Sequence, residues 1–247
     1  MIAGRVRCSP VPAAAALVAL ALVGAACASE PDRSVAMVPS SFTDLTDAID
    51  AALDTETVWI IAGSSRLVSQ LADGADADLL ITADRETMQR AVDADLVDTP
   101  LGVVASNRLV LAVAPGNPAG IDELADLTDD DLLIGVCAIE VPCGRLAEQA
   151  TTTIGLTVAA DTEEPNVRSL ALKITRGELD GGLIYATDAR AFGLDTVDDD
   201  ALAPFVTDYV AASVHTAGRE GAGREIVDLL RSAEGRDILL ARGFSLP

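Results

Sequence analysis

Small residues and hydrogen-bond donors follow several short apolar segments of this chain, at points where a helical pattern begins. Such turns occur at Val38–Ser41, Ala62–Ser65, Val141–Gly144 and Pro165–Val167. The first backbone N–H groups of a helix lack an intrahelical acceptor, and the helix start carries partial positive charge. Ser41 and Ser64 add hydroxyl donors to two of these turns. Turns of this kind, brought together, would form a neutral, electropositive cage that suits a small anion.

A serine at a helix start also has a simpler role. Ser, Thr, Asp and Asn are the usual N-cap residues, because their side-chain oxygen accepts a hydrogen bond from the helix that they begin. Taken singly, Ser41 and Ser64 are better explained as N-caps. Spacing alone therefore leaves both readings open, and the elements that carry these turns must be considered.

The elements that would position these residues alternate between short apolar strands and amphipathic helices. Strands are predicted at Val35–Val38, Val58–Ile61, Leu79–Thr82, Leu109–Ala114, Leu132–Val136 and Gly182–Tyr185. Helices are predicted at Phe42–Leu53, Arg85–Ala94, Val167–Arg176, Arg224–Leu230 and from Ser232 to Arg242, from apolar spacings of three and four. This alternation indicates an α/β protein with mostly parallel sheets, whose ligands bind beyond the carboxyl ends of the strands.

The overall composition restricts the function further. The chain has 247 residues, enough for one large domain or for two lobes of roughly 100 to 120 residues each. Its formal charge of −22 argues against a nucleic-acid-binding protein and against attachment to an anionic membrane by charge. The single histidine, His215, gives little support for histidine-based metal sites. The acidic stretch Asp195–Asp200 is interpreted as a solvated surface rather than a calcium site.

The N-terminus has the three parts of an export signal. Arg5 and Arg7 precede an apolar stretch that is too short for a comfortable membrane-spanning helix, and small residues lead to Cys27. This pattern resembles a bacterial lipobox, so residues 1–26 are predicted to be a lipoprotein signal peptide, Cys27 the lipidated residue and 27–33 a tether. The protein would then be lipid-anchored at the outer face of the cytoplasmic membrane. The alternative is an ordinary secretory signal, which would leave a free exported protein.

Two further cysteines lie in the exported part. Cys137 and Cys143 are six positions apart, and an oxidising compartment favours a disulfide between them. A zinc site that includes His215 is the rival interpretation, but two cysteines and one distant histidine supply too few ligands.

Beyond these features, the chain resembles the periplasmic molybdate-binding proteins of ABC importers. The similarity is carried, in order along the chain, by Ser40–Asp44, Gly63–Ser65, Ala77–Asp84, Asn107–Leu111, Pro115–Pro118, Val141–Gly144, Asn166–Arg168, Gly182–Ala189, Ser232–Gly235 and Ala241–Phe244. The resemblance implies that Ser41 and Ser64 hold an oxyanion with hydroxyl and amide donors. It also implies backbone N–H donors at Cys143 and Val167 and a phenolic donor at Tyr185. Without it, Tyr185 would be interpreted as a core residue, while Arg66 and Arg168 are interpreted as surface or supporting residues rather than ligands.

The same resemblance implies a two-lobed periplasmic-binding-protein fold of type II. Lobe one would comprise residues 34–108 and 216–247, and lobe two residues 109–215, with hinge strands at Leu109–Ala114 and Tyr209–Thr216. The lobes would close on molybdate, and on tungstate, and deliver it to an ABC permease in the membrane. The protein would be a monomer without catalytic activity or a cofactor.

Three other functions are alternatives for this sequence. The same scaffold could bind sulfate, phosphate or a small organic anion. A hydrolase with Ser41 or Ser64 as nucleophile lacks a G-x-S-x-G turn and has His215 as its sole histidine base. A lipoprotein that only scaffolds partners would show no stabilisation by a ligand.

Overall fold

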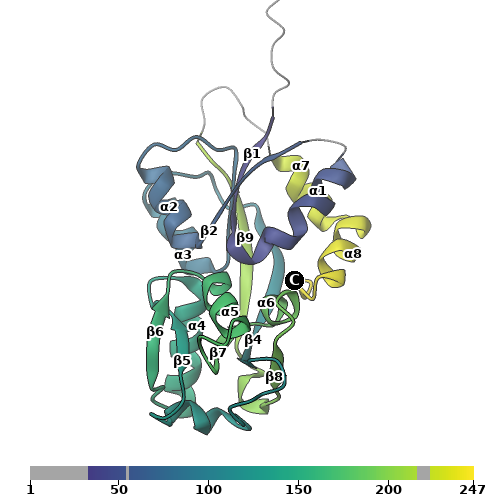
Figure 1. Cartoon of the computed structure of the whole chain (residues 1–247). Coiled ribbons are helices and arrows are strands. Elements are labelled where there is room, and N and C mark those ends of the chain that lie inside the picture. Colours follow the sequence, from purple (N-terminus) through teal and green to yellow (C-terminus); the bar gives the residue numbers. More distant parts are fainter. Residues whose placement is uncertain (1–32, 54–55, 216–222) are drawn as a thin grey trace, which may run out of the picture. The chain divides into compact units, whose positions relative to one another are not determined.

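The computed structural model describes residues 33–53, 56–215 and 223–247 (Figure 1). The predicted signal peptide, Cys27 and the tether up to residue 32 lie outside the described residues. Residues Arg33–Pro247 cluster into one compact unit. None of the helices described in it has the length and hydropathy needed to span a bilayer.

The strands of the described residues form one mixed sheet of nine strands. They are β1 (Val35–Pro39), β2 (Val58–Ala62), β3 (Leu79–Thr82), β4 (Gly102–Val113), β5 (Ile134–Cys137), β6 (Ala160–Glu164), β7 (Gly181–Tyr185), β8 (Asp195–Val197) and β9 (Val206–Ser213). The strand order is β2-β1-β3-β9-β4-β7-β5-β6, and β8 pairs with β4. The predicted α/β class is confirmed, but the sheet is one continuous path rather than two separate sheets.

The centre of this sheet is antiparallel, which differs from the mostly parallel sheets expected. β1 pairs in parallel with β2 and β3, and β5 does so with β6 and β7. Between these two groups, β9 runs antiparallel to β3 and to the first half of β4, whereas the second half of β4 pairs with β7 and β8. β4 therefore connects the two groups, and it begins seven residues before the predicted start at Leu109.

Most of the helices lie between these strands along the chain, and the last two follow β9. They are α1 (Thr46–Leu53), α2 (Ser64–Ala72), α3 (Arg85–Asp93), α4 (Pro142–Ile154), α5 (Val167–Thr175), α6 (Ala186–Ala191), α7 (Arg224–Arg231) and α8 (Ala233–Ala241). The described residues also form the short 3-10 helices η1 (Ser40–Leu45), η2 (Leu124–Thr128) and η3 (Asp200–Leu202). The first predicted helix thus begins as η1 and continues as α1. The acidic stretch Asp195–Asp200 contributes β8 and the start of η3.

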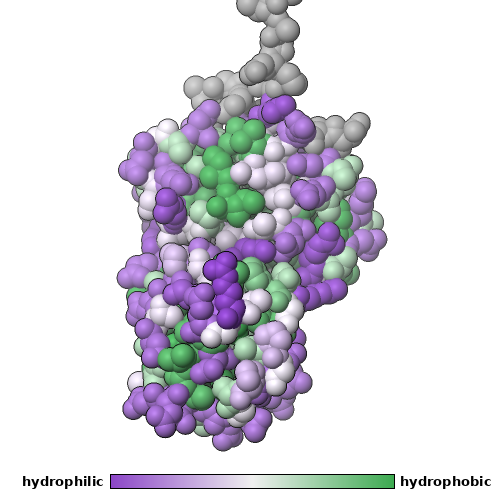
Figure 2. Space-filling model, viewed as in Figure 1, coloured by the Kyte–Doolittle hydropathy of each residue, from purple (hydrophilic) through white to green (hydrophobic). Residues whose placement is uncertain are grey.

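Aliphatic side chains fill most of the core, and four aromatic rings form one cluster. The Tyr209 ring lies 5.1 Å from Phe42, 5.3 Å from Phe244 and 6.4 Å from Tyr185, measured between ring centroids. Both tyrosines of the chain are therefore in this cluster. Most of the face seen in Figure 2 is hydrophilic, with an apolar patch where the edge strand β2 runs.

Candidate functional site

The five residues predicted to hold an anion line one cavity. Ser41, Ser64, Cys143, Val167 and Tyr185 surround it together with Pro39, Ser40, Gly63, Ala83, Val141, Pro142 and Asn166. Each of the five is at most 4% exposed. They come from the turns that follow β1, β2, β5 and β6, and from the end of β7. The fold therefore brings the predicted donors together from segments far apart in the sequence.

The helix starts at this cavity are mostly without side-chain caps. Pro39, Gly63 and Val141 occupy the N-cap positions of η1, α2 and α4, and none of them makes a side-chain cap hydrogen bond. Asn166, at the start of α5, accepts a hydrogen bond from Ser169 N at 3.0 Å. Because Ser41 and Ser64 lie inside their helices, the simpler explanation of these serines as N-caps is wrong.

Backbone donors are consequently available at the cavity. The amides of Ser41, Ser64, Cys143 and Val167 belong to the first two positions of η1, α2, α4 and α5. Amides at these positions have no acceptor within their own helix. The Ser64 hydroxyl adds a donor, because Ser64 Oγ accepts a hydrogen bond from Ala83 N at 3.0 Å and its proton has no acceptor among the described residues.

The Tyr185 hydroxyl gives the clearest evidence about what the cavity can bind. Tyr185 Oη is buried and has no hydrogen-bond partner among the described residues. Burial raises the pKa of this phenol well above its usual value, and the neighbouring Tyr209, Asp84 and Asp188 raise it further. The group is therefore a neutral donor whose hydrogen bond is unmade, at a cost of about 1–3 kcal/mol. A polar ligand in the cavity would satisfy it.

The cavity walls lie close together in this structure. The lining residues leave little free space between them. Gly63 contributes to this closeness, because a Cβ atom at its position would lie 2.7 Å from Pro165 O. The turn before α2 and the turn before α5 thus approach each other in a way that a side chain at residue 63 would prevent.

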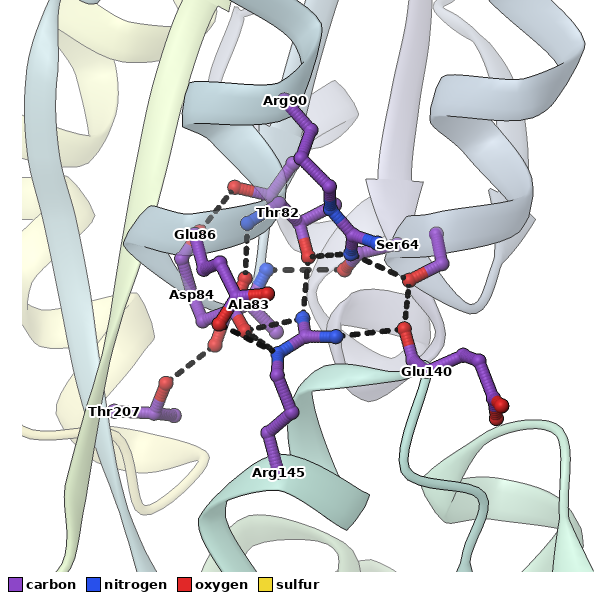
Figure 3. Close-up of polar contacts among 11 residues, drawn as sticks. Ser64, Thr82, Ala83, Asp84, Glu86, Arg90, Glu140, Arg145 and Thr207 are labelled. Carbon is purple, nitrogen blue, oxygen red and sulfur yellow. Dashed lines mark hydrogen bonds and ion pairs between the residues drawn. The ribbon is translucent and has the colours of Figure 1, made fainter.

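Beside the cavity, one arginine ties the start of α3 to the start of α4 (Figure 3). Arg145 Nε and Nη2 donate to Asp84 Oδ2 at 3.0 and 2.5 Å, and Nη2 also donates to Thr87 Oγ1 at 2.6 Å. Arg145 Nη1 donates to Glu140 O at 2.7 Å. We call these contacts the Arg145 bridge. Both charged side chains of the bridge are only 16% exposed, so solvent weakens their attraction less than at the surface.

Two further contacts lie near the cavity, one between α2 and the segment before α4 and one between α5 and η1. Ser65 Oγ donates to Glu140 O, which is also an acceptor in the Arg145 bridge. On α5, Arg168 Nη1 donates to Asp44 Oδ2 at 2.7 Å, and its guanidinium lies 4.8 Å from the Phe192 ring centroid. Arg168 is therefore paired with a carboxylate and is not among the residues that line the cavity, and Arg66 is exposed.

The two remaining cysteines are joined in the structure. A disulfide links Cys137, at the end of β5, to Cys143, the second residue of α4. The enclosed loop is tight, since a Cβ at Gly144 would lie 2.0 Å from Ala138 O. The bond fixes the residue whose amide lies at the cavity, and it leaves Cys143 without a thiol.

Neither the zinc nor the hydrolase interpretation is supported by this geometry. His215 Nε2 lies 2.8 Å from Asp98 Oδ1 and its Nδ1 lies 3.0 Å from Asp95 O, so the histidine is engaged away from both serines. Within the described part of the chain, no three histidine, cysteine or carboxylate side chains are grouped to hold a metal ion.

Comparison with known proteins agrees with this architecture. Residues 37–245 match the family model described as bacterial extracellular solute-binding protein. The chain belongs to this family. It is therefore a solute-binding component of transport and not an enzyme.

Individual proteins of the solute-binding family are similar to this chain in sequence or in fold. The molybdate-binding protein ModA of Mycobacterium bovis is 31% identical over 217 residues, which cover 87% of this chain and 83% of that protein. Among solved structures, the periplasmic molybdate-binding protein of Azotobacter vinelandii has a TM-score of 0.70 at 14% identity, over 87% of this chain and all of that chain. The sulfate-binding protein SubI of Mycobacterium tuberculosis has a TM-score of 0.71 at 16% identity, over 86% of each chain. At these identities the two structures show a shared fold.

Several residues around this cavity are not predicted from the sequence. The sequence places Tyr209 only at the start of a hinge strand and Asn107 only within a motif of the resemblance. Asp84 and Arg145 are 61 positions apart, so their pairing had no local signal. Asn107 falls within the Asn107–Leu111 segment of the resemblance, which gives it no role at the site.

Proposed function

We propose that this protein captures molybdate, and also tungstate, in the cavity lined by Ser41, Ser64, Cys143, Val167 and Tyr185. The observation that supports this most strongly is the buried Tyr185 hydroxyl, which has no partner and lies at the same cavity as the serines and the first-turn amides. The 31% identity to a molybdate-binding protein supports molybdate over other anions.

The lining residues fit a small dianion chemically. Each donor is a neutral hydroxyl or backbone N–H, and no lysine or arginine is among the lining residues. A hydrogen bond to a charged oxygen is roughly twice as strong as one to a neutral acceptor. Neutral donors also avoid the cost of burying an uncompensated cation when no anion is bound. Molybdate and tungstate are larger than sulfate, so the size of the cavity would select between sulfate and the two larger anions.

Closure of two lobes would complete the site. In the proposed division, residues 34–108 and 216–247 supply Ser41 and Ser64, and residues 109–215 supply the other three donors. A tetrahedral oxyanion would enter when the walls separate, and by bridging the two sets of donors it would favour the closed form. The Arg145 bridge and the Arg168–Asp44 pair would add contacts made only on closure.

The delivery step follows from the family. We propose that the closed protein presents its anion to an ABC permease, and that a lipid on Cys27 holds it at the outer face of the cytoplasmic membrane. Cleavage and modification at Cys27 would be tested by the mass of the protein purified from membranes.

Isothermal titration of the exported domain tests the proposal. Molybdate and tungstate should bind with one-to-one stoichiometry, and sulfate and phosphate should give no heat. The Ser41→Ala/Ser64→Ala double variant should lose this binding, whereas Thr151→Val, which removes a buried hydroxyl bonded only within α4, should retain it. Binding of sulfate or phosphate in place of molybdate would move the assignment to that anion. No heat with any of these anions would refute it.

A further inference from the structure

A buried chain of hydrogen bonds lies behind Ser41. Ser41 Oγ is 2.7 Å from Tyr209 Oη, and Asn107 Nδ2 donates to Tyr209 Oη at 3.2 Å. Asn107 Nδ2 also donates to Thr187 Oγ1 at 2.7 Å, which in turn donates to Asp188 Oδ2 at 3.3 Å. All five residues are less than 6% exposed. These five residues therefore form hydrogen bonds to one another and not to bulk water.

The direction of these hydrogen bonds is fixed by Asn107. Its Oδ1 accepts from the backbone N–H of Arg108 at 3.0 Å, so the amide nitrogen must be the atom that faces Tyr209 and Thr187. A primary amide has two N–H donors, and both are used here. Tyr209 Oη is consequently an acceptor toward Asn107.

The Tyr209 proton then has one suitable acceptor. Burial raises the pKa of Tyr209 far above its usual value, so its hydroxyl stays protonated. If Ser41 donated to Tyr209, the phenol would accept twice and its own proton would have no acceptor among the described residues. An unmade hydrogen bond in a buried site is costly. The favoured arrangement has Tyr209 donating to Ser41 Oγ.

We propose that Tyr209, held by Asn107, is a positioning residue that orients the Ser41 hydroxyl as a donor toward the cavity. Because Ser41 Oγ accepts from Tyr209, its own proton is free to point at an oxyanion. This inference rests on the proposed function, since it explains how one of the anion donors is oriented. Tyr209 acts through Ser41 and does not line the cavity itself.

Tyr209→Phe is a clean perturbation of this arrangement. The substitution removes Oη and retains the ring that packs against Phe42 and Phe244. The Ser41 hydroxyl then loses its donor and can turn away from the cavity. We expect molybdate affinity to fall about tenfold, the size expected when a hydrogen bond to a charged ligand is weakened.

A double-mutant cycle separates positioning from a general structural effect. Molybdate affinity is measured by titration calorimetry for the exported domain of the original sequence, Tyr209→Phe, Ser41→Ala and the double variant, with the unfolding temperature of each. If Tyr209 acts through Ser41, adding Tyr209→Phe to Ser41→Ala should change the affinity by less than about twofold. Thr151→Val is the control for the loss of a buried hydroxyl elsewhere and should leave the affinity unchanged.

The outcomes distinguish this inference from the proposed function. Tight molybdate binding by the original sequence, with a tenfold loss on Tyr209→Phe in both backgrounds, would overturn the positioning role alone. No binding of molybdate, tungstate, sulfate or phosphate by the original sequence would overturn both proposals. If Tyr209→Phe does not fold, Asn107→Ala is taken through the same cycle, and an equal loss in both backgrounds again counts against the inference.

Discussion

Replacing Tyr185 by phenylalanine should affect ligand binding and stability in opposite directions. The change removes one buried oxygen, and that oxygen has no partner among the described residues. A hydrogen bond to a charged ligand contributes about 1.5–3 kcal/mol, so the molybdate affinity of Tyr185→Phe should fall about 10- to 150-fold. Without ligand, the same variant no longer buries an unsatisfied hydroxyl, so it should be at least as stable as the original.

The expected gain in stability can be bounded. An unsatisfied buried hydroxyl costs about 1–3 kcal/mol, and a gain of 1 kcal/mol raises the unfolding temperature by about 2–4 °C in a domain of this size. Titration calorimetry gives the affinity, and differential scanning calorimetry without ligand gives the unfolding temperature. Tyr209→Phe is the matched control, because Tyr209 Oη is bonded to Ser41 and Asn107 and its removal should lower the unfolding temperature.

Two results would refute this reasoning. Unchanged molybdate affinity in Tyr185→Phe would mean that the hydroxyl does not contact the ligand. A loss of ligand-free stability as large as that of Tyr209→Phe would mean that Tyr185 Oη has a partner in the protein.

Three further predictions follow from the site and its surroundings. Reducing the Cys137–Cys143 bond should lower the free energy of unfolding by about 2 kcal/mol, since its loop is short, and titration with reductant should show weaker molybdate binding. Gly63→Ala should weaken molybdate binding about 5- to 150-fold in calorimetry, because the new Cβ would lie 2.7 Å from Pro165 O and such overpacking costs about 1–3 kcal/mol in the closed form. Burial raises the pKa of Asp188 to about 7, so the folded chain holds a proton that the unfolded chain releases near pH 4. Denaturant unfolding should therefore show stability falling from about pH 4 to 7, and Asp188→Asn should remove much of that slope.

Local patterns were sufficient to predict many of the elements. The strand Leu79–Thr82 has the predicted bounds, and the helix at Arg85 ends one residue earlier than expected. These segments carry apolar residues at a clear period and are bounded by turn residues, so the sequence alone identifies them. The edge strand β2 ends one residue later than predicted. The other edge strand, β6 (Ala160–Glu164), is not predicted because its Ala-Asp-Thr-Glu-Glu sequence has no apolar alternation.

Long-range polar contacts explain what the sequence could not reveal. The first half of β4 contains Ser106 and Asn107, which look like loop residues but are buried. Ser106 Oγ donates to Asp208 at 2.8 Å, and Asn107 donates to Thr187 and Tyr209, all more than 75 positions away. A buried polar residue is stable when its partners are present, and the fold supplies those partners. The set of site residues came from family resemblance, since spacing alone favoured N-caps for the serines.

The Arg145 bridge has a consequence for the kinetics of release. Its residues Arg145, Thr87 and Glu140 do not line the cavity, so they do not choose the anion. Under the proposed closure Arg145 nevertheless has to separate from Asp84 and Thr87 before a bound anion can leave. Residence time and selectivity are then set by different side chains, and substitutions in the bridge would change how long an anion is held without changing which anion is held.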